Sequence, residues 1–204
     1  PIIGTLLGVA RDSEGKQVDY LPLYAQDEQG YDNLCHLVSR AHLERPLEFE
    51  PHVRLTDLDG HTGGLIAFSG ASEGALTKLL AEGQQSHAEI LLQKLQELFP
   101  ERLYIELARR GNEVEERAEA ALVELAYGRD LPLIATNPAN FAEPHMHKAH
   151  DAMLCIAGST HIDADERAKS NPESYVKTYH MMDEAFDDLP EAVQNTLVVA
   201  QRCA

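Results

Sequence analysis

The segment Leu65-Ile66-Ala67-Phe68-Ser69-Gly70 is the clearest indication of how this chain folds. Its apolar run has the length of a buried strand, it ends at a serine and a glycine, and a helix-like stretch follows at residues 73–82. The same succession recurs downstream, with strands predicted at residues 103–108 and 131–136 and a long helix between them. Strands that alternate with helices are typical of a parallel α/β layer or barrel, because parallel neighbours need crossover connections.

The pattern extends in both directions from this segment. Upstream, strands are predicted at residues 2–9 and 18–25, followed by a helix at 31–43. Downstream, Ser86 and Glu89 have the spacing of a capping box before a further helix. The last part is predicted to be mostly helical from about residue 145, with helices at 148–156, 178–186 and 191–203. Since neither a repeat nor a long linker interrupts the pattern, we treat residues 1–204 as a single domain.

Composition excludes some classes of protein. The 204 residues carry 34 acidic against 17 basic side chains, a formal net charge of −17, which opposes binding to DNA or to an anionic membrane. No apolar run approaches the length that spans a bilayer. Cys35, Cys155 and Cys203 are too few and too scattered for a disulfide framework. Free thiols of this kind indicate a cytoplasmic protein.

The residues alone leave the chemistry open. Glycine-rich phosphate-binding motifs and the GxSxG elbow are absent from the sequence. His145, His147 and His150 form the densest histidine group and could chelate a metal ion, although structural or solvated histidines are the commoner case. Cys155 is predicted to be a small buried side chain within an apolar helix stripe. On this basis the chain is an acidic α/β domain of undefined activity.

Seven segments of this chain occur in the same order in a known protein family. They are PIIG at residues 1–4, YDNL at 31–34, LIAFSG at 65–70, FPERLYIEL at 99–107, LPLIATN at 131–137, AHDAMLCI at 149–156 and LPEA at 189–192. Together they resemble the PHP (polymerase and histidinol phosphatase) domain of the alpha subunits of bacterial DNA polymerase III. The resemblance covers essentially the whole chain, and seven segments in order are far more specific than any one of them.

The resemblance implies a distorted, TIM-like (β/α)7 barrel whose rim holds up to three metal ions in active members. It also implies that this chain is a truncated PHP domain, because the family's opening His-x-His strand and the acidic strand after it would precede residue 1. The polymerase palm with its catalytic aspartates would lie beyond residue 204. We therefore expect a partial barrel that lacks its first strands and does not itself polymerise DNA.

The family's metal-ligand positions can be carried over one by one. They fall on side chains that have lost the expected donor, namely Leu6, Tyr20, Ala71, Arg110, Pro138 and Asn140. Leu6 and Pro138 offer no side-chain donor, and Arg110 brings a positive charge to a place where cations would bind. Of the histidine group, only His150 matches a residue common in the family, at the start of a helix. We expect no bound metal, no catalytic residue and no phosphoesterase activity.

Without metal-dependent activity, the function that the resemblance implies is a structural role in DNA replication. The resemblance implies a parent DNA-directed DNA polymerase, a Mg²⁺-dependent nucleotidyltransferase, in which a PHP domain with a degenerate metal site is a structural and interaction module. Its expected partners are the rest of the polymerase alpha subunit and the proofreading exonuclease subunit, with DNA bound only through the parent protein. The alternative is a metal-dependent phosphoesterase or pyrophosphatase that uses Mn²⁺ or Zn²⁺ at ligands not yet placed, such as the His145–His150 group.

Overall fold

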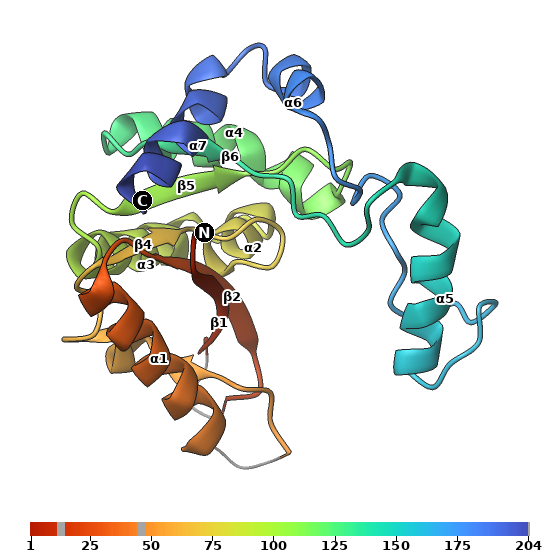
Figure 1. Cartoon of the computed structure of the whole chain (residues 1–204), viewed down its shortest axis with the longest axis horizontal. Helices are drawn as coiled ribbons and strands as arrows, with labels where there is room; N and C mark the ends of the chain where they lie inside the picture. The colour runs from red at the N-terminus through yellow and green to blue at the C-terminus, as the bar shows by residue number, and fades with distance from the viewer. Residues whose placement is uncertain (12–14, 45–47, 204) are drawn as a thin grey trace.

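A computed structural model describes residues 1–11, 15–44 and 48–203 of the chain. Six strands form one sheet in the order β3-β1-β2-β4-β5-β6 (Figure 1). Their bounds are β1 Gly4–Ala10, β2 Val18–Ala25, β3 Val53–Arg54, β4 Leu65–Phe68, β5 Leu103–Leu107 and β6 Leu133–Ala135. Within the described residues β3 and β6 are not paired, so the sheet is open. The α/β class is confirmed, and the open sheet is consistent with the partial barrel that the resemblance implies.

Strand direction differs in part from the parallel layer that the sequence predicts. β4, β5 and β6 are parallel, with helices between them, as expected. β2, however, is antiparallel to both of its neighbours, β1 and β4. Too few residues separate Ala10 from Val18 for a crossover helix, so β1 and β2 form a hairpin. The short strand β3, which pairs with the end of β1, was not predicted.

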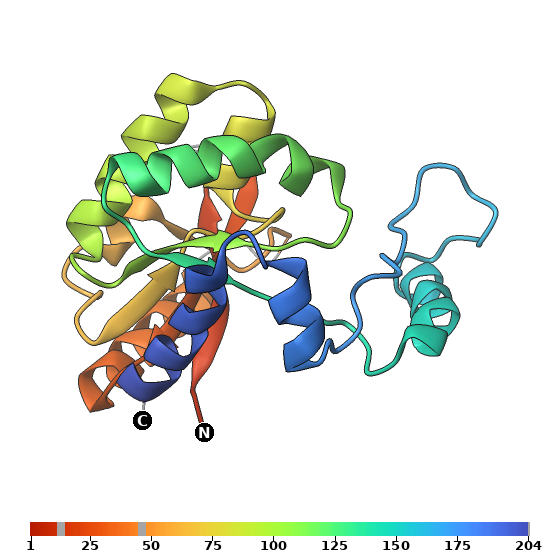
Figure 2. The same cartoon turned by 90° about the horizontal axis from the view of Figure 1, so that it is seen from above.

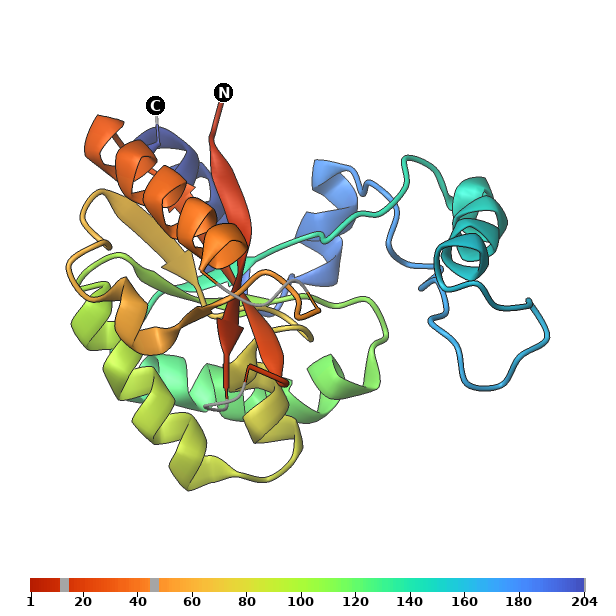
Figure 3. The same cartoon turned by 90° about the horizontal axis from the view of Figure 1, so that it is seen from below.

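Seven α-helices of the described residues complete the fold. They are α1 Glu28–Leu43, α2 Ala75–Ala81, α3 Gln85–Leu98, α4 Glu113–Gly128, α5 His147–Ala157, α6 Tyr179–Ala185 and α7 Pro190–Arg202, with two short 3₁₀ turns at Leu55–Leu58 and Pro144–Met146. α2, α3 and α4 gather on one side of the sheet and α7 lies on the other (Figures 2 and 3). The predicted capping box at Ser86 is wrong, because α3 begins at Gln85, so that Ser86 lies inside the helix, and Gln84 precedes the helix without a side-chain cap. None of the described helices is long and apolar enough to cross a membrane.

The strands have two distinct faces because their side chains alternate. On the helix-covered face, strand residues such as Leu23, Leu65 and Ile105 are fully buried in one large aliphatic cluster with residues of α1 to α4. On the opposite face, Phe68 and Tyr104 form a smaller cluster with Val199 of α7. We call this second side the open face, because part of it borders a cleft instead of a helix.

The C-terminal part is less helical than expected. After β6 the chain leaves the layered body, forms α5 and a long irregular segment, and returns as α6 and α7 (Figures 1 and 2). We call residues 139–178 the projecting lobe and the rest of the described chain the body. Cys155 is buried within this lobe, as predicted. α7 is fixed to the sheet by Asn195, whose side-chain amide donates to the carbonyl of Leu133 at 2.7 Å.

Candidate functional site

A cleft of about 570 Å³ opens on the open face. Three of its walls follow the carboxyl ends of the parallel strands β4, β5 and β6, where loops carry the sites of α/β proteins. Its lining includes all six positions carried over from the family, namely Leu6, Tyr20, Ala71, Arg110, Pro138 and Asn140. Residues far apart in the sequence are thus brought to one place.

The loop after β4 is positioned by a glycine and a serine. Gly70 has φ +81°, and a Cβ there would lie 2.7 Å from the carbonyl oxygen of Tyr20, so only glycine fits this turn. Ser69 is buried, and its hydroxyl accepts the amide hydrogen of Glu106 at 2.9 Å. The Ser69-Gly70 pair therefore joins β4 to β5 and offers no exposed nucleophile.

Arg110 is held by an ion pair beneath the rim of the cleft. Its guanidinium group bonds the carboxylate of Glu115 through Nη2 and through Nε, the latter at 3.2 Å. Nη2 also donates to the hydroxyl of Ser72 at 2.9 Å. Both members of the ion pair are almost fully buried. The positive charge of Arg110 is therefore a fixed part of the cleft wall, and Glu115 is committed to neutralising it.

Glu106 is the site residue that sequence reasoning missed. It lies on β5, which is buried at every position, and its side chain lines the cleft. Thr136 donates to its Oε1 at 2.6 Å, whereas its Oε2 is buried and has no hydrogen-bond partner among the described residues. Burial raises the pKa of Glu106 against the opposing effects of Thr136 and Arg110. The signal was present in the sequence, since an acidic residue inside an apolar strand needs an explanation.

The remaining walls supply few ligands for a cation. Leu6 leaves 52% of its surface exposed and has only an aliphatic side chain, and Ala71 and Pro138 offer no side-chain donor. The Tyr20 hydroxyl donates to Glu50 at 3.1 Å, and burial, together with Glu50, raises the pKa of Tyr20. Burial likewise raises the pKa of Tyr24 to about 12. Both phenols are therefore neutral and weak ligands at physiological pH.

The cleft does not fit the metal cluster that the PHP family implies. Within residues 1–11, 15–44 and 48–203, no three His, Cys, Asp or Glu side chains are grouped closely enough to hold a metal ion. Of the described residues that line the cleft, Glu73 and Glu106 carry carboxyl groups, and burial raises the pKa of Glu106, which favours its neutral form. The charge of Arg110 adds to the cost of placing a cation there.

The histidine group lies elsewhere, in the projecting lobe. The ring of His150 bonds the hydroxyl of Ser170 through Nδ1 at 2.7 Å, and His147 contacts the carbonyl oxygen of the same serine at 3.1 Å. Phe141 packs against both rings. His145 is exposed and lies 3.1 Å from Glu143. His147 and His150 thus take part in packing and hydrogen bonding within the projecting lobe.

Comparison with known proteins identifies the fold around this cleft. The family model of the PHP domain matches residues 1–110, so the chain belongs to the PHP domain family. Over its whole length the chain is 40% identical to DNA polymerase III subunit alpha of Caulobacter vibrioides. It is 35% identical to the protein of that name from Pseudomonas aeruginosa and 34% identical to the one from Rickettsia bellii. The chain spans only 17–18% of the length of these relatives.

Proposed function

We propose that this chain is the PHP region of a replicative DNA polymerase and acts there as a structural and interaction module without phosphoesterase activity. In this proposal the parent protein carries out Mg²⁺-dependent DNA synthesis in the cytoplasm. The module contacts the rest of the alpha subunit and helps to seat the proofreading exonuclease subunit. DNA is bound through the parent protein, whose other regions supply the polymerase active site.

One observation carries the proposal. The six positions at which the family would hold metal line a single cleft, and the basic one, Arg110, is ion-paired with Glu115. A phosphoesterase of this family needs oxygen and imidazole donors, with no competing positive charge. A cleft whose wall is a buried arginine–glutamate pair supports a structural role, because both charges are used to join the loop after β5 to α4.

The acidic character of the chain supports the same role. A formal net charge of −17 disfavours direct contact with a polyanion and favours contact with basic protein surfaces. Such a domain can lie beside a DNA-binding channel and repel duplex that approaches from outside. Its function then depends on its surface and on correct folding, with no requirement for turnover in the cleft.

A metal-dependent phosphoesterase or pyrophosphatase is the second candidate. It is favoured by membership of a metal-dependent family and by Glu106, a buried carboxyl group on the cleft floor with a free oxygen. In this reading Mn²⁺ or Zn²⁺ would bind at Glu106 or near His147. The two candidates differ in whether hydrolysis requires those side chains.

A phosphoester assay separates them. The purified protein is tested for hydrolysis of bis-p-nitrophenyl phosphate with added Mn²⁺ or Zn²⁺, beside the variants Glu106→Gln and His147→Ala. We expect no metal-dependent turnover above that of the variants. Turnover by the wild type that either substitution abolishes would refute the structural role and establish the phosphoesterase.

The partner part of the proposal needs its own measurement. The full-length polypeptide is mixed with the exonuclease subunit, and the mass of the complex is measured by light scattering after size exclusion. We expect a stable complex that is lost when residues 1–204 are deleted. A complex that survives this deletion would show that the exonuclease is seated elsewhere.

A further inference from the structure

Two side chains that line the cleft each hold a buried oxygen atom without a hydrogen-bond partner among the described residues. The atoms are Oε2 of Glu106 and Oδ1 of Asn137. Within the described part of the chain only one other buried side-chain atom has no partner, on Ser174, which does not line the cleft. A buried polar atom without a partner costs free energy, because it has lost its hydrogen bonds to water. A ligand that supplies the two missing hydrogen bonds would recover this free energy.

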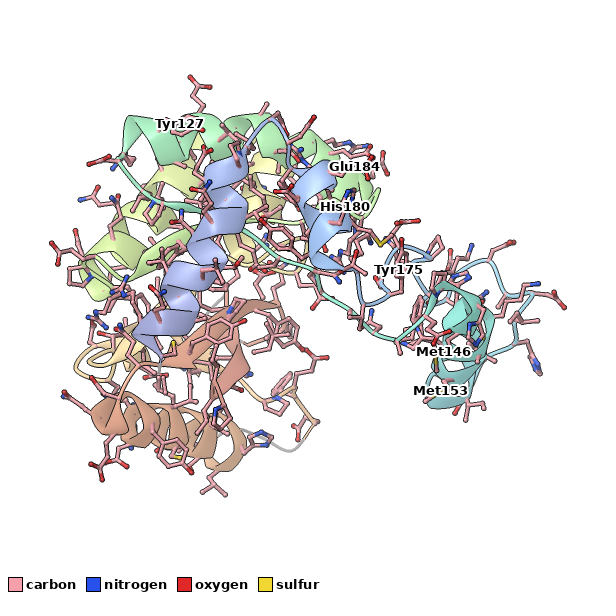
Figure 4. The ribbon with its side chains drawn as sticks, turned by 45° about the horizontal axis from the view of Figure 1, so that its top comes forward. Tyr127, Met146, Met153, Tyr175, His180 and Glu184 are labelled. Atoms are coloured by element: carbon pink, nitrogen blue, oxygen red, sulfur yellow. The ribbon has the colours of Figure 1, made fainter. Side chains whose placement is uncertain are left out.

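The other end of each side chain is already bonded, so the positions of both oxygens are defined. The hydroxyl of Thr136 donates to Oε1 of Glu106 at 2.6 Å, and Nδ2 of Asn137 donates to the carbonyl oxygen of Tyr175 at 3.0 Å. Figure 4 shows Tyr175 where the projecting lobe meets the body. Thr136 and Asn137 follow β6, which pairs with the strand that carries Glu106. The two unpaired oxygens therefore come from neighbouring strands.

The charges around the cleft favour a neutral ligand. The fixed positive charge of Arg110 opposes an organic cation as it opposes a metal ion. The carboxyl groups of Glu73 and Glu106, together with the net charge of −17 on the chain, oppose an anion. A neutral ligand meets neither penalty.

Hydroxyl groups match the two oxygens in either charge state of Glu106. A hydroxyl group both donates and accepts, and its hydrogen turns about the C–O bond. It can donate to the carboxylate form of Glu106 and accept from the carboxylic acid form, which burial favours by raising the pKa. Asn137 needs a second donor at the same time. Two neighbouring hydroxyl groups of one molecule supply both hydrogen bonds.

The size and the walls of the cleft suit a molecule as large as a monosaccharide. Its volume of about 570 Å³ lies within the range of about 300–1,000 Å³ that is usual for small-molecule sites. Leu6, Pro22 and Pro138 provide apolar surface against which the C–H groups of a ring can pack. A small turn of the carboxyl group of Glu106 about its last torsion angle, which is soft, brings Oε2 towards such a ligand.

We infer that the cleft binds a neutral polyol of the monosaccharide class, with neighbouring hydroxyl groups bonded to Glu106 and Asn137. This inference goes beyond the proposed function and does not depend on it, because binding of a polyol requires neither a metal ion nor hydrolysis.

Saturation-transfer difference NMR with the full-length polypeptide tests the inference. The probe is myo-inositol, a neutral ring with a hydroxyl group on every carbon. The control ligand is trans-1,4-cyclohexanediol, whose two hydroxyl groups are not neighbours. We expect saturable binding of myo-inositol in the millimolar range or tighter, and binding of the control that is weaker by about ten-fold. No saturable binding of myo-inositol, or equal binding of the two ligands, would overturn the inference.

Three substitutions test whether the ligand bonds to the two oxygens. Glu106→Met and Asn137→Ala each remove one acceptor and should weaken the binding of myo-inositol by about ten-fold. Glu97→Met on α3 removes an exposed carboxylate on the far side of the sheet and should leave the dissociation constant unchanged. Circular dichroism identifies the variants that fold. Equal affinity of a folded cleft variant and of Glu97→Met would contradict the inference.

Hydrogen exchange in the wild type gives a readout that needs no substitution. Binding of myo-inositol should slow amide exchange at residues 70–74 and 136–140, which line the cleft, and leave α3 unchanged. Protection elsewhere, or no protection, would overturn the inference even where neither cleft variant folds. Metal-dependent hydrolysis of the phosphoester would refute the proposed function and leave these readouts intact, so the two failures can be told apart.

Discussion

The body and the projecting lobe are held together by different forces. In the body, alternate residues of β2 are buried, β4 and β5 are buried throughout, and aliphatic side chains from α1 to α4 pack against them. In the lobe, order comes from polar contacts, chiefly those of Asp151 with Arg167 and of His150 with Ser170. The difference shows that one chain uses apolar burial to make a stable layer and hydrogen bonds to present a helix away from it.

The contrast between body and lobe predicts different effects of substitutions on stability. Apolar burial is spread over many residues of the body and resists local opening, whereas the lobe depends on a few directional contacts. Substitutions in the body should therefore change the free energy of unfolding of the whole protein. Substitutions in the lobe should change local opening with little effect on global stability.

The largest effect is expected where a charge is buried in the body. Arg110→Met leaves Glu115 buried without its partner, and we expect it to lower the free energy of unfolding by about 4 kcal/mol. The double variant Arg110→Met with Glu115→Leu should recover most of this loss, because it removes both charges. Urea denaturation followed by circular dichroism measures both. A loss below about 1 kcal/mol for the single variant would mean that Glu115 reaches water, contrary to its burial.

A cavity in the aliphatic cluster should come next. Leu92 on α3 is fully buried, and Leu92→Ala should lower the free energy of unfolding by about 3 kcal/mol. Ile90 on the same helix is exposed, so Ile90→Ala is the matched control and should change it by about 0.5 kcal/mol or less. Urea denaturation measures both free energies of unfolding. Equal effects of the two substitutions would contradict a body that is stabilised by apolar burial.

A substitution at Glu106 is expected to raise the free energy of unfolding, by a smaller amount than the losses above. Burial raises its pKa in the folded state, so its contribution to stability is present at acidic pH and is lost as the pH rises through the folded pKa. Glu106→Gln removes this dependence, and at pH 8 the variant should be more stable than the wild type by on the order of 1 kcal/mol. The difference should shrink towards pH 4. A stability advantage of the variant that is independent of pH would show that Glu106 does not titrate as proposed.

The smallest global effect is expected in the lobe. The pKa of Asp151 lies well below its usual range, because Arg167 and the amide of Ser170 stabilise the carboxylate. In Arg167→Met the NMR titration of the Asp151 carboxyl carbon should move towards the ordinary pKa of an aspartate, while Tm stays unchanged. Since the wild-type pKa is depressed, the stabilising contact is present above the ordinary pKa and is lost as the pH falls through the depressed one. A large drop in Tm would contradict the separation of lobe and body.

The sequence predicted the body better than the lobe. Alternating burial in β2 and the glycine at position 70 leave local signals, and the resemblance placed six residues that line one cleft. The antiparallel hairpin was missed although the eight residues between the predicted strands at 2–9 and 18–25 are too few for a crossover helix, because the parallel pattern of the later strands was extended to these two. Glu106 was passed over because it lay within a predicted strand, in a segment that was considered only for the family resemblance.

The lobe could not be derived because its contacts are distant in sequence. Ser170 meets His147 and His150 about twenty residues away, and Asn171 bonds the carbonyl of Arg110 in the body at 3.1 Å. Contacts between residues so far apart leave no periodic pattern of apolar or polar residues in the sequence. The expectation of a mostly helical C-terminal part followed from apolar spacing alone, which does not show that the segment after α5 is ordered by side-chain hydrogen bonds.

The central claim is that the cleft has exchanged metal ligands for a fixed arrangement of protein charges. Electron paramagnetic resonance measures it most directly, because free Mn²⁺ gives a six-line spectrum that weakens when the ion binds. On titration with Mn²⁺ we expect less than one bound ion per chain, with no difference between the wild type and Glu106→Gln. One or more ions bound per wild-type chain, and released by Glu106→Gln, would contradict the account.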